Sequence, residues 1–318
     1  MRFFMFPGQG SQYIGMGKLL AEYHSAAREV FQEVDDALSF SLSRLMFDGS
    51  ESDLNLTINT QPALMAVSVA ASHVLFRETG KKLSELASYV AGHSLGEYSA
   101  LCVAGSLKLA DAARLLRLRG EAMQQAVPKG KGGMLALLGV THEQASTIAT
   151  QAQAGQICTI ANDNGGGQLV LSGHMEAIER AMEIAPNHGV RRSVLLPVSA
   201  PFHCPLMQPA ADKMAEALAN ITLLSPQVPL VANVTASAVS DAITIKKLLV
   251  EQVTGTVRWR ESVEWLAGQE LLQAVELGAG NVLCGLVKRI NRDIASTAIG
   301  EPSHIEAFLE ILAHKAAS

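Results

Sequence analysis

Two strand–turn–helix patterns constrain the fold of this chain more than any other feature. Phe3–Phe6 is a short apolar run that ends in the glycine-rich segment 7–12, and residues 86–91 form a second run that ends in segment 92–96. Helix-compatible sequence follows each turn, including the amphipathic stretch Leu109–Gln125. Units of this kind place parallel strands in a sheet with helices packed on its faces. The sequence therefore predicts an α/β protein with a parallel-sheet core.

A different pattern interrupts this plan in the middle of the chain. The segment 128–133 is polar and glycine-rich, as is typical of a hinge. The residues that follow, up to 196, show the order strand–helix–strand–strand–helix–strand, which defines a ferredoxin-like unit. The first pattern returns from Val198 onward. We therefore expect an α/β-hydrolase-like large domain formed by residues 1–127 and 198–318, a ferredoxin-like small domain formed by residues 128–197, and a ligand cleft between them.

Charge and hydropathy argue against several classes of partner. The net charge is −5, and 25 Lys and Arg are scattered among 30 Asp and Glu, so the sequence shows no basic face for nucleic acid or an anionic membrane. Residues 62–76 form the longest apolar stretch, but Ser68, Ser72 and His73 interrupt it, which favours a buried helix over a membrane span. The four cysteines lie far apart and match no metal motif. We expect a cytoplasmic monomer without a bound metal.

The segment Gly92-His93-Ser94-Leu95-Gly96 matches the motif G-x-S-x-G. An apolar strand precedes it and helical sequence follows it, which is the context of a nucleophilic serine at the edge of a sheet. The two glycines then relieve the crowding of a strained turn. The alternative is a serine that caps a helix between two incidental glycines. The flanking elements favour the nucleophile.

A nucleophilic serine needs a base that takes its proton, so one of the nine histidines should serve it. Most of them lie in helical patterns or polar surroundings, and His93 is expected to point to a different face of the turn from Ser94. His203 stands in a segment stiffened by Pro201 and Pro205, and a fixed position suits a base. The residues alone leave the choice of His203 open.

Acyl transfer from such a serine also needs two backbone N–H groups that stabilise the oxyanion. Leu95, directly after the serine, and Gln9, in the turn after the first strand, fit these two positions. A simple tight turn at 7–12 is the alternative. Because both turns follow parallel strands, we expect them to converge at one edge of the sheet.

Several segments together resemble a known family. The sequence resembles the malonyl-CoA:acyl carrier protein transacylases of bacterial fatty acid synthesis over nearly its whole length. The segments that carry the resemblance are FPGQGSQ at 6–12, TQPAL at 60–64, GHSLGEYSA at 92–100, RG at 119–120, GH at 173–174, PFHC at 201–204, VRW at 257–259 and ELGAG at 276–280. Each segment alone is weak evidence for this family, but the segments taken together are specific to it.

The resemblance implies a role for each residue of the reaction centre. Ser94 becomes the nucleophile and His203 its base, and the backbone N–H groups of Gln9 and Leu95 become the oxyanion donors. In this family a backbone carbonyl rather than a carboxylate orients the histidine, and Gln252 matches that position.

The resemblance also implies that Arg119 binds the free carboxylate of a malonyl group. Malonyl differs from acetyl by this carboxylate, so a selective pocket needs a cation, and a planar guanidinium forms two parallel charge-assisted bonds to it. From the residues alone, Arg114 and Arg117 on the same helix would be equal candidates. The other residues that the resemblance assigns to the substrate pocket are Gln61, Asn162 and the bulky Phe202.

The reaction that the resemblance implies is a ping-pong transfer. A malonyl group moves from coenzyme A to Ser94 and then to the phosphopantetheine thiol of acyl carrier protein, with the coenzyme A thioester as substrate and without a bound metal or redox cofactor. Carrier proteins are acidic, so Lys288, Arg289 and Arg292 are candidates for carrier docking. The alternative role of these cations is to complement a helix C-terminus.

Three other functions stay open. A serine esterase or thioesterase would use the same serine and histidine. The same transfer could also load malonyl groups for polyketide synthesis or for a malonate decarboxylase. A catalytically silent scaffold is the third alternative, and the presence of both Ser94 and His203 argues against it.

Overall fold

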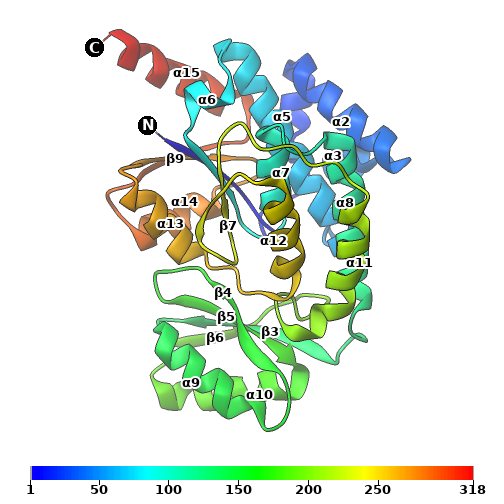
Figure 1. Ribbon diagram of the computed structural model, residues 1–318, viewed down its shortest axis with the longest axis vertical. Helices are drawn as coiled ribbons and strands as arrows, with labels where there is room; N and C mark the ends of the chain where they lie inside the picture. The colour runs from blue at the N-terminus through cyan, green and yellow to red at the C-terminus, as the bar shows by residue number, and fades with distance from the viewer. Residues whose placement is uncertain (1, 318) are drawn as a thin grey trace.

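A computed structural model describes residues 2–317 of the chain and contains two separate sheets (Figure 1). The strands of the larger sheet are, in spatial order, β10 (Ala295–Ile299), β9 (Gln273–Leu277), β1 (Phe3–Phe6), β2 (Tyr89–Gly92), β7 (Leu230–Ala232) and β8 (Ser237–Val239). All neighbours are parallel except β7 and β8. The predicted parallel-sheet core is therefore confirmed. The second strand starts later than predicted because Leu83–Leu86 forms the short helix α6.

Side chains of β1 alternate between the two faces of this sheet, as the period of a strand requires. Phe4 and Phe6 belong to one core, whereas Phe3 and Met5 belong to a second core together with α13 (Trp259–Gly268) and α14 (Val282–Ile290). Helices thus cover both faces, which explains why the strands read as continuous apolar runs. The helices that contribute to the first core, besides α6, are α1 (Lys18–Tyr23), α2 (Ser25–Leu38), α3 (Leu42–Asp48), α4 (Glu51–Leu54), α5 (Thr57–Thr79), α7 (Gly96–Val103), α8 (Leu109–Gln125), α11 (Gln208–Ala219), α12 (Ala242–Thr254) and α15 (Pro302–Ala317).

Helix α5 contains the apolar stretch for which the sequence predicts a buried helix. Nearly all of its residues from Thr57 to Leu75 are buried, on every side of the helix, which is the pattern of a helix surrounded by other elements. The prediction of a buried helix is confirmed. Within residues 2–317, no helix has both the length and the apolar character needed to cross a membrane.

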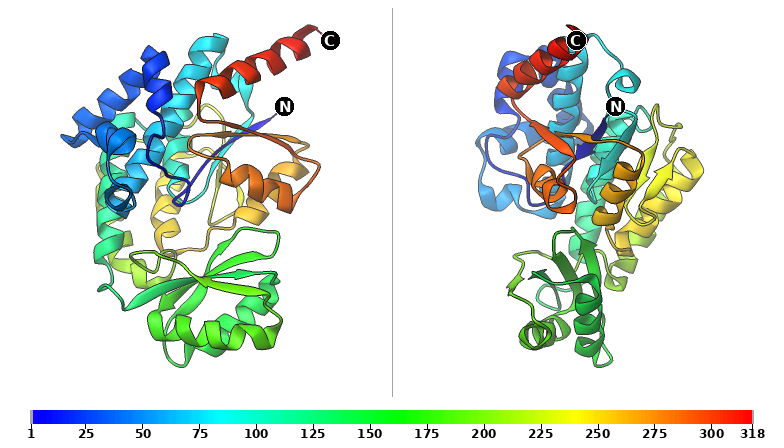
Figure 2. Two further views of the ribbon diagram at one scale, coloured as in Figure 1. Left: turned by 180° about the vertical axis from the view of Figure 1, so that it is seen from behind. Right: turned by 90° about the vertical axis from the view of Figure 1, so that its left-hand side faces the viewer.

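The smaller sheet is built from one continuous segment of the chain. Its elements follow the order β3 (Gly132–Leu138), α9 (His142–Gln153), β4 (Cys158–Asp163), β5 (Gln168–His174), α10 (Met175–Ile184) and β6 (Arg192–Leu195), with short 3₁₀ turns at Ala185–His188 and, beyond the sheet, Pro205–Met207. The strands are antiparallel in the order β4-β5-β3-β6. Helices α9 and α10 lie on the face turned away from the larger sheet (Figure 2). Met134, Ala136 and Val170 on the opposite face join the first core.

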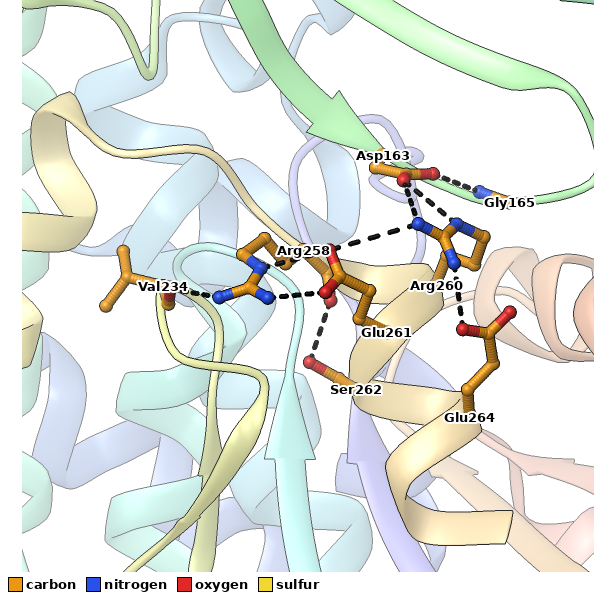
Figure 3. A network of polar contacts seen from close by, with 8 residues as sticks. All are labelled: Asp163, Gly165, Val234, Arg258, Arg260, Glu261, Ser262 and Glu264. Carbon is orange, nitrogen blue, oxygen red and sulfur yellow. Dashed lines mark hydrogen bonds and ion pairs between the residues drawn. The ribbon is translucent and has the colours of Figure 1, made fainter. Parts of the chain in front are cut away.

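Hydrogen bonds and ion pairs attach the end of β4 to the first turn of α13 and to the segment before it. The backbone N–H of Val257 donates to Ala161 O at 2.8 Å, and that of Asp163 donates to Val257 O at 3.0 Å. The Arg260 guanidinium lies 2.9 Å from the buried carboxylate of Asp163 and also binds Glu264 (Figure 3). This junction holds the residues on either side of Asp163 at the boundary between the two sheets.

Helices α5 and α8 cross unusually closely at Gly120. A methyl group added there would lie 2.6 Å from Thr57 O and 2.7 Å from the Cα atom of Ile58, a distance at which backbone must move. The crossing places Gln61 of α5 beside Arg119 of α8. The small residue at 120 is therefore part of what positions the site described below.

We predict that Gly120→Ala lowers the free energy of unfolding by about 1–3 kcal/mol, the usual range for overpacking a buried contact. Gly285→Ala in α14 is the matched control, because no atom lies within 4 Å of the added methyl. The control should be neutral or slightly stabilising, since alanine favours a helix. Chemical denaturation of both variants checks the difference, and equal stability of the two would show that the close crossing is dispensable.

Candidate active site

Ser94 occupies a strained turn between β2 and α7. Its φ of 54° is in the left-handed region, which non-glycine residues rarely adopt. A side chain at Gly92 would lie 1.9 Å from the backbone of Gly96, and one at Gly96 would lie 2.3 Å from Phe6 O. Both glycines are therefore required by the close approach of backbone segments. Because Phe6 and Gly92 are register partners in parallel strands, the turn that contains Gln9 lies beside the turn that contains Ser94.

The structure brings Ser94 and His203 within hydrogen-bond distance. Ser94 Oγ lies 2.8 Å from His203 Nε2, and His203 Nδ1 lies 2.9 Å from the backbone oxygen of Gln252. A carbonyl oxygen can only accept a hydrogen bond, so Nδ1 carries the proton and the lone pair of Nε2 faces the serine. Burial, with the nearby Arg119 charge, lowers the pKa of His203 to about 3. The imidazole is therefore neutral and able to accept the serine proton.

Arg119 projects from α8 toward Ser94 and is only 1 % exposed. Its Nη1 donates to Gln61 Oε1 at 2.8 Å, and its Nη2 donates to Gln252 Oε1 at 2.9 Å and to Ser94 Oγ at 3.2 Å. Its Nε has no partner within the described residues. A buried guanidinium beside a serine hydroxyl, with only three of its five N–H donors used in these bonds, can bind an anionic group that reaches the serine.

A buried polar network lies beside Ser94 and Gln252 and helps to hold both residues in place. Glu97 accepts hydrogen bonds from the backbone N–H of Asn233 and from Gln252 Nε2. Asn233 Oδ1 accepts the N–H of Ser94 at 2.8 Å, and its Nδ2 donates to Gly92 O at 2.7 Å. Sequence reasoning missed Glu97, Asn233 and the side chain of Gln252. Only Glu97 had a signal, since it follows the serine motif and is an acidic residue in an otherwise apolar helix.

The pocket beside Ser94 is small and is lined by side chains from helices of the large part of the fold, from strands of the smaller sheet and from the loops between them. Its volume is about 120 Å³. Eight residues with a predicted role in the site line it: Gln9, Gln61, Ser94, Leu95, Arg119, Asn162, Phe202 and His203. Five further residues complete the lining: His93, Met123, Met134, Leu196 and Val198. A wider groove of about 500 Å³ shares Gln9, His93, Asn162 and Leu196 with the pocket and continues along α14. A long substrate that lies in the groove can therefore place its acyl end in the pocket beside Ser94.

His93 lines the pocket although the sequence suggested that it points to another face of the turn from Ser94. Its Nε2 lies 2.9 Å from Asn164 Oδ1, and its ring packs against Trp259 at a centroid distance of 5.7 Å. It makes no hydrogen bond to Ser94 in the described network. His93 thus connects the serine turn to the end of β4.

Of the three cations expected to bind a carrier protein, Arg289 alone lines the groove. It donates to Gln168 Oε1 at 3.1 Å. Lys288 and Arg292 are exposed near the end of α14. As for metals, residues 2–317 contain no group of three or more His, Cys, Asp or Glu side chains that could hold an ion.

We predict that the His203 ring stays neutral when the pH is lowered from about 8 to about 5, because burial lowers its pKa from the ordinary 6.5. The unfolded chain binds this proton and the folded chain does not, so this histidine makes folding less favourable as the pH falls below about 6.5. Nitrogen-15 NMR of the histidine rings, with His203→Gln to assign the signal, measures the titration. A midpoint near 6.5 for this signal would contradict the geometry.

Comparison with known proteins agrees with this arrangement. The family described as "Acyl transferase domain" matches residues 3–300. A "Malonyl CoA-acyl carrier protein transacylase" of Bacillus subtilis (strain 168) is 42% identical over 310 residues, which cover 97% of this chain and 96% of that protein. The crystal structure of an acyl-carrier-protein-S-malonyltransferase from Bartonella henselae has a TM-score of 0.96 at 52% identity and covers 98% of this chain and 100% of that one. A malonyl-transacylase in complex with a type II PKS acyl-carrier protein has a TM-score of 0.93 at 42% identity, covering 98% and 99%. The chain therefore belongs to the acyl transferase domain family and, within it, to the malonyl CoA-acyl carrier protein transacylases.

Proposed function

We propose that this chain transfers a malonyl group from malonyl-CoA to the phosphopantetheine thiol of an acyl carrier protein. The observation that carries the proposal is the buried Arg119 guanidinium, 3.2 Å from the Ser94 hydroxyl in a small pocket. The names of the relatives support the same substrates. Only one of those three names gives a pathway, a type II PKS, so the carrier is proposed here only as a class.

In the proposed mechanism Ser94 attacks the thioester carbonyl and His203 takes its proton. The backbone N–H groups of Gln9 and Leu95 donate to the oxyanion, a role supported by the adjacent turns in which the two residues lie. The protonated His203 gives its proton to the leaving thiolate of coenzyme A. The carrier thiol then attacks the seryl ester, with His203 as base again, and Ser94 is released.

Selectivity for the acyl group is proposed to come from Arg119, which would form a bidentate ion pair with the malonyl carboxylate. Gln61 holds one of its nitrogens at 2.8 Å and would fix the orientation of the guanidinium. Phe202 and Asn162 are proposed to close the pocket around the acyl group, since both are largely buried and line it.

We also propose a finer description of the architecture. The strand–serine turn–helix unit supports an α/β-hydrolase-like core for residues 1–127 and 198–318. The order of elements and the strand order β4-β5-β3-β6 support a ferredoxin-like small domain for residues 128–197.

The four unpaired cysteines support a reducing, cytoplasmic location. Carrier docking at Lys288, Arg289 and Arg292, a monomeric state and catalysis without a bound cofactor stay predictions.

The first test mixes the protein with malonyl-CoA alone and measures the mass of the intact chain. We expect one added malonyl group, located on Ser94 by peptide mapping, and none in Ser94→Ala. Addition of holo carrier protein should then remove the label from the enzyme and place it on the carrier. Release as free malonate instead would favour a thioesterase, and an unmodified Ser94 under conditions of active transfer would refute the seryl intermediate.

The second test concerns Arg119. Arg119→Met should reduce kcat/KM for malonyl transfer by an amount equivalent to about 2–5 kcal/mol, because it leaves the malonyl carboxylate buried without a partner. Transfer of acetyl, which has no carboxylate, should fall much less. Arg117→Met is the matched control on the same helix, since Arg117 binds Asn59 and does not line the pocket. Equal losses for malonyl and acetyl would remove Arg119 from selectivity.

A further inference from the structure

Glu97 is a buried acidic residue beside the active site that the proposed mechanism does not use. It lies on α7 and is 1 % exposed. Both of its carboxyl oxygens are acceptors, one for the backbone N–H of Asn233 and one for Gln252 Nε2, each at 2.5 Å. A buried carboxyl group this close to the reaction centre requires a physical reason.

The direction of the hydrogen bonds connects Glu97 to Arg119. A guanidinium only donates, so the Gln252 oxygen must face Arg119, at 2.9 Å, and its Nε2 must face Glu97. Two N–H donors directed at the two carboxyl oxygens are the pattern that stabilises an ionised carboxylate. When Glu97 is ionised, the site therefore holds one buried cation and one buried anion, joined through a single amide group.

The groups that surround Glu97 limit what else can titrate. Of the elements packed against α7, strands β1 and β7 carry no ionisable side chain, β2 carries only Tyr89, and among the side chains of α5 and α8 the one that acts on the charge of Glu97 is Arg119. Within α7, burial raises the pKa of Tyr98 to about 12. In the pocket, burial lowers the pKa of His203 to about 3 and also lowers that of His93.

Burial raises the pKa of Glu97 to about 8, against the opposing effects of its two hydrogen bonds and of Arg119. Glu97 is therefore the member of this network that changes protonation near neutral pH. A malonyl carboxylate that binds Arg119 adds a second anion for the same cation. Two buried carboxylates near one cation repel each other, which favours the protonated form of one of them.

We propose that Glu97 is a specificity-determining residue that acts through Gln252: in its ionised form the carboxylate balances the charge of Arg119, and it takes up a proton from solvent when the malonyl carboxylate binds to Arg119. The proposal rests on the proposed function, and Glu97 contacts neither the acyl group nor the reacting atoms. An acetyl group brings no charge and takes up no proton. Selectivity for malonyl over acetyl should therefore depend on pH in a way that reports on Glu97.

The test measures kcat/KM for formation of the acyl-enzyme from malonyl-CoA and from acetyl-CoA between about pH 7 and about pH 9. The ratio of the two constants cancels everything that the substrates share, including the coenzyme A arm. For one titrating group we expect the wild-type ratio to fall about tenfold over this range. In Glu97→Gln the carboxylate is absent, so the ratio should change less than about twofold over the same range.

Glu276→Gln is the matched control. Glu276 is also fully buried and accepts two backbone N–H bonds, from Leu283 and Cys284, but it does not line the pocket. The Glu276→Gln substitution removes a similar carboxylate from the core, and this variant should keep the wild-type pH dependence of the ratio of malonyl to acetyl kcat/KM. A merely structural effect of losing a buried carboxylate would make the two variants behave alike.

Proton uptake provides a readout that needs no variant. With a pH-indicator dye at about pH 8.5, acyl-enzyme formation from malonyl-CoA should take up more protons than formation from acetyl-CoA. Equal uptake, a wild-type ratio independent of pH, or a pH dependence that persists in Glu97→Gln would each overturn the proposal. These outcomes are distinct from failure of the proposed function, in which wild-type Ser94 would not be malonylated at any pH.

Discussion

The candidate active site is organised by one buried positive charge. A guanidinium that is almost fully removed from water is costly unless acceptors compensate for the lost hydration, and the two terminal nitrogens of Arg119 find acceptors on α5, on α12 and on the serine itself. Gln252 is the central partner because its side chain accepts from Arg119 while its backbone oxygen accepts from His203. The charge that would select the substrate and the imidazole that would activate the nucleophile are thus positioned by the same residue.

The two groups that would carry the chemistry both lie on strained backbone. Ser94 has a φ of 54° and His203 a φ of 57°, and such conformations persist only where the surroundings determine them strongly. For Ser94 the surroundings are Asn233, which accepts its N–H, and the close packing of Gly92 and Gly96 against neighbouring backbone. For His203 they are its two ring hydrogen bonds and the buried position of its side chain. Preorganisation of this kind keeps the two side chains aligned before a substrate binds.

The smaller sheet completes the site by supplying one wall of it. The inward face of that sheet packs into the core of the larger part through Met134, Ala136 and Val170. The Asp163–Arg260 ion pair and the backbone bonds to Val257 fix the end of β4, so the neighbouring residues Asn162 and Asn164 are held at the pocket and groove. A wall attached in this way limits the room for the acyl group while the groove stays open for a longer chain.

Local features of the sequence were sufficient to predict the parallel sheet, the buried helix α5, the serine turn and the order of elements in the smaller sheet, because each depends on residues close together in the chain. The proximity of Ser94, His203, Arg119 and Gln252 could be expected only through the family resemblance, since periodicity and spacing contain no information about contacts between such distant residues. The roles of Glu97, Asn233 and His93 in the network were not predicted. Whether a buried polar side chain is a partner or an isolated group depends on which donors and acceptors the folded chain places next to it, and that was decided by the tertiary structure alone.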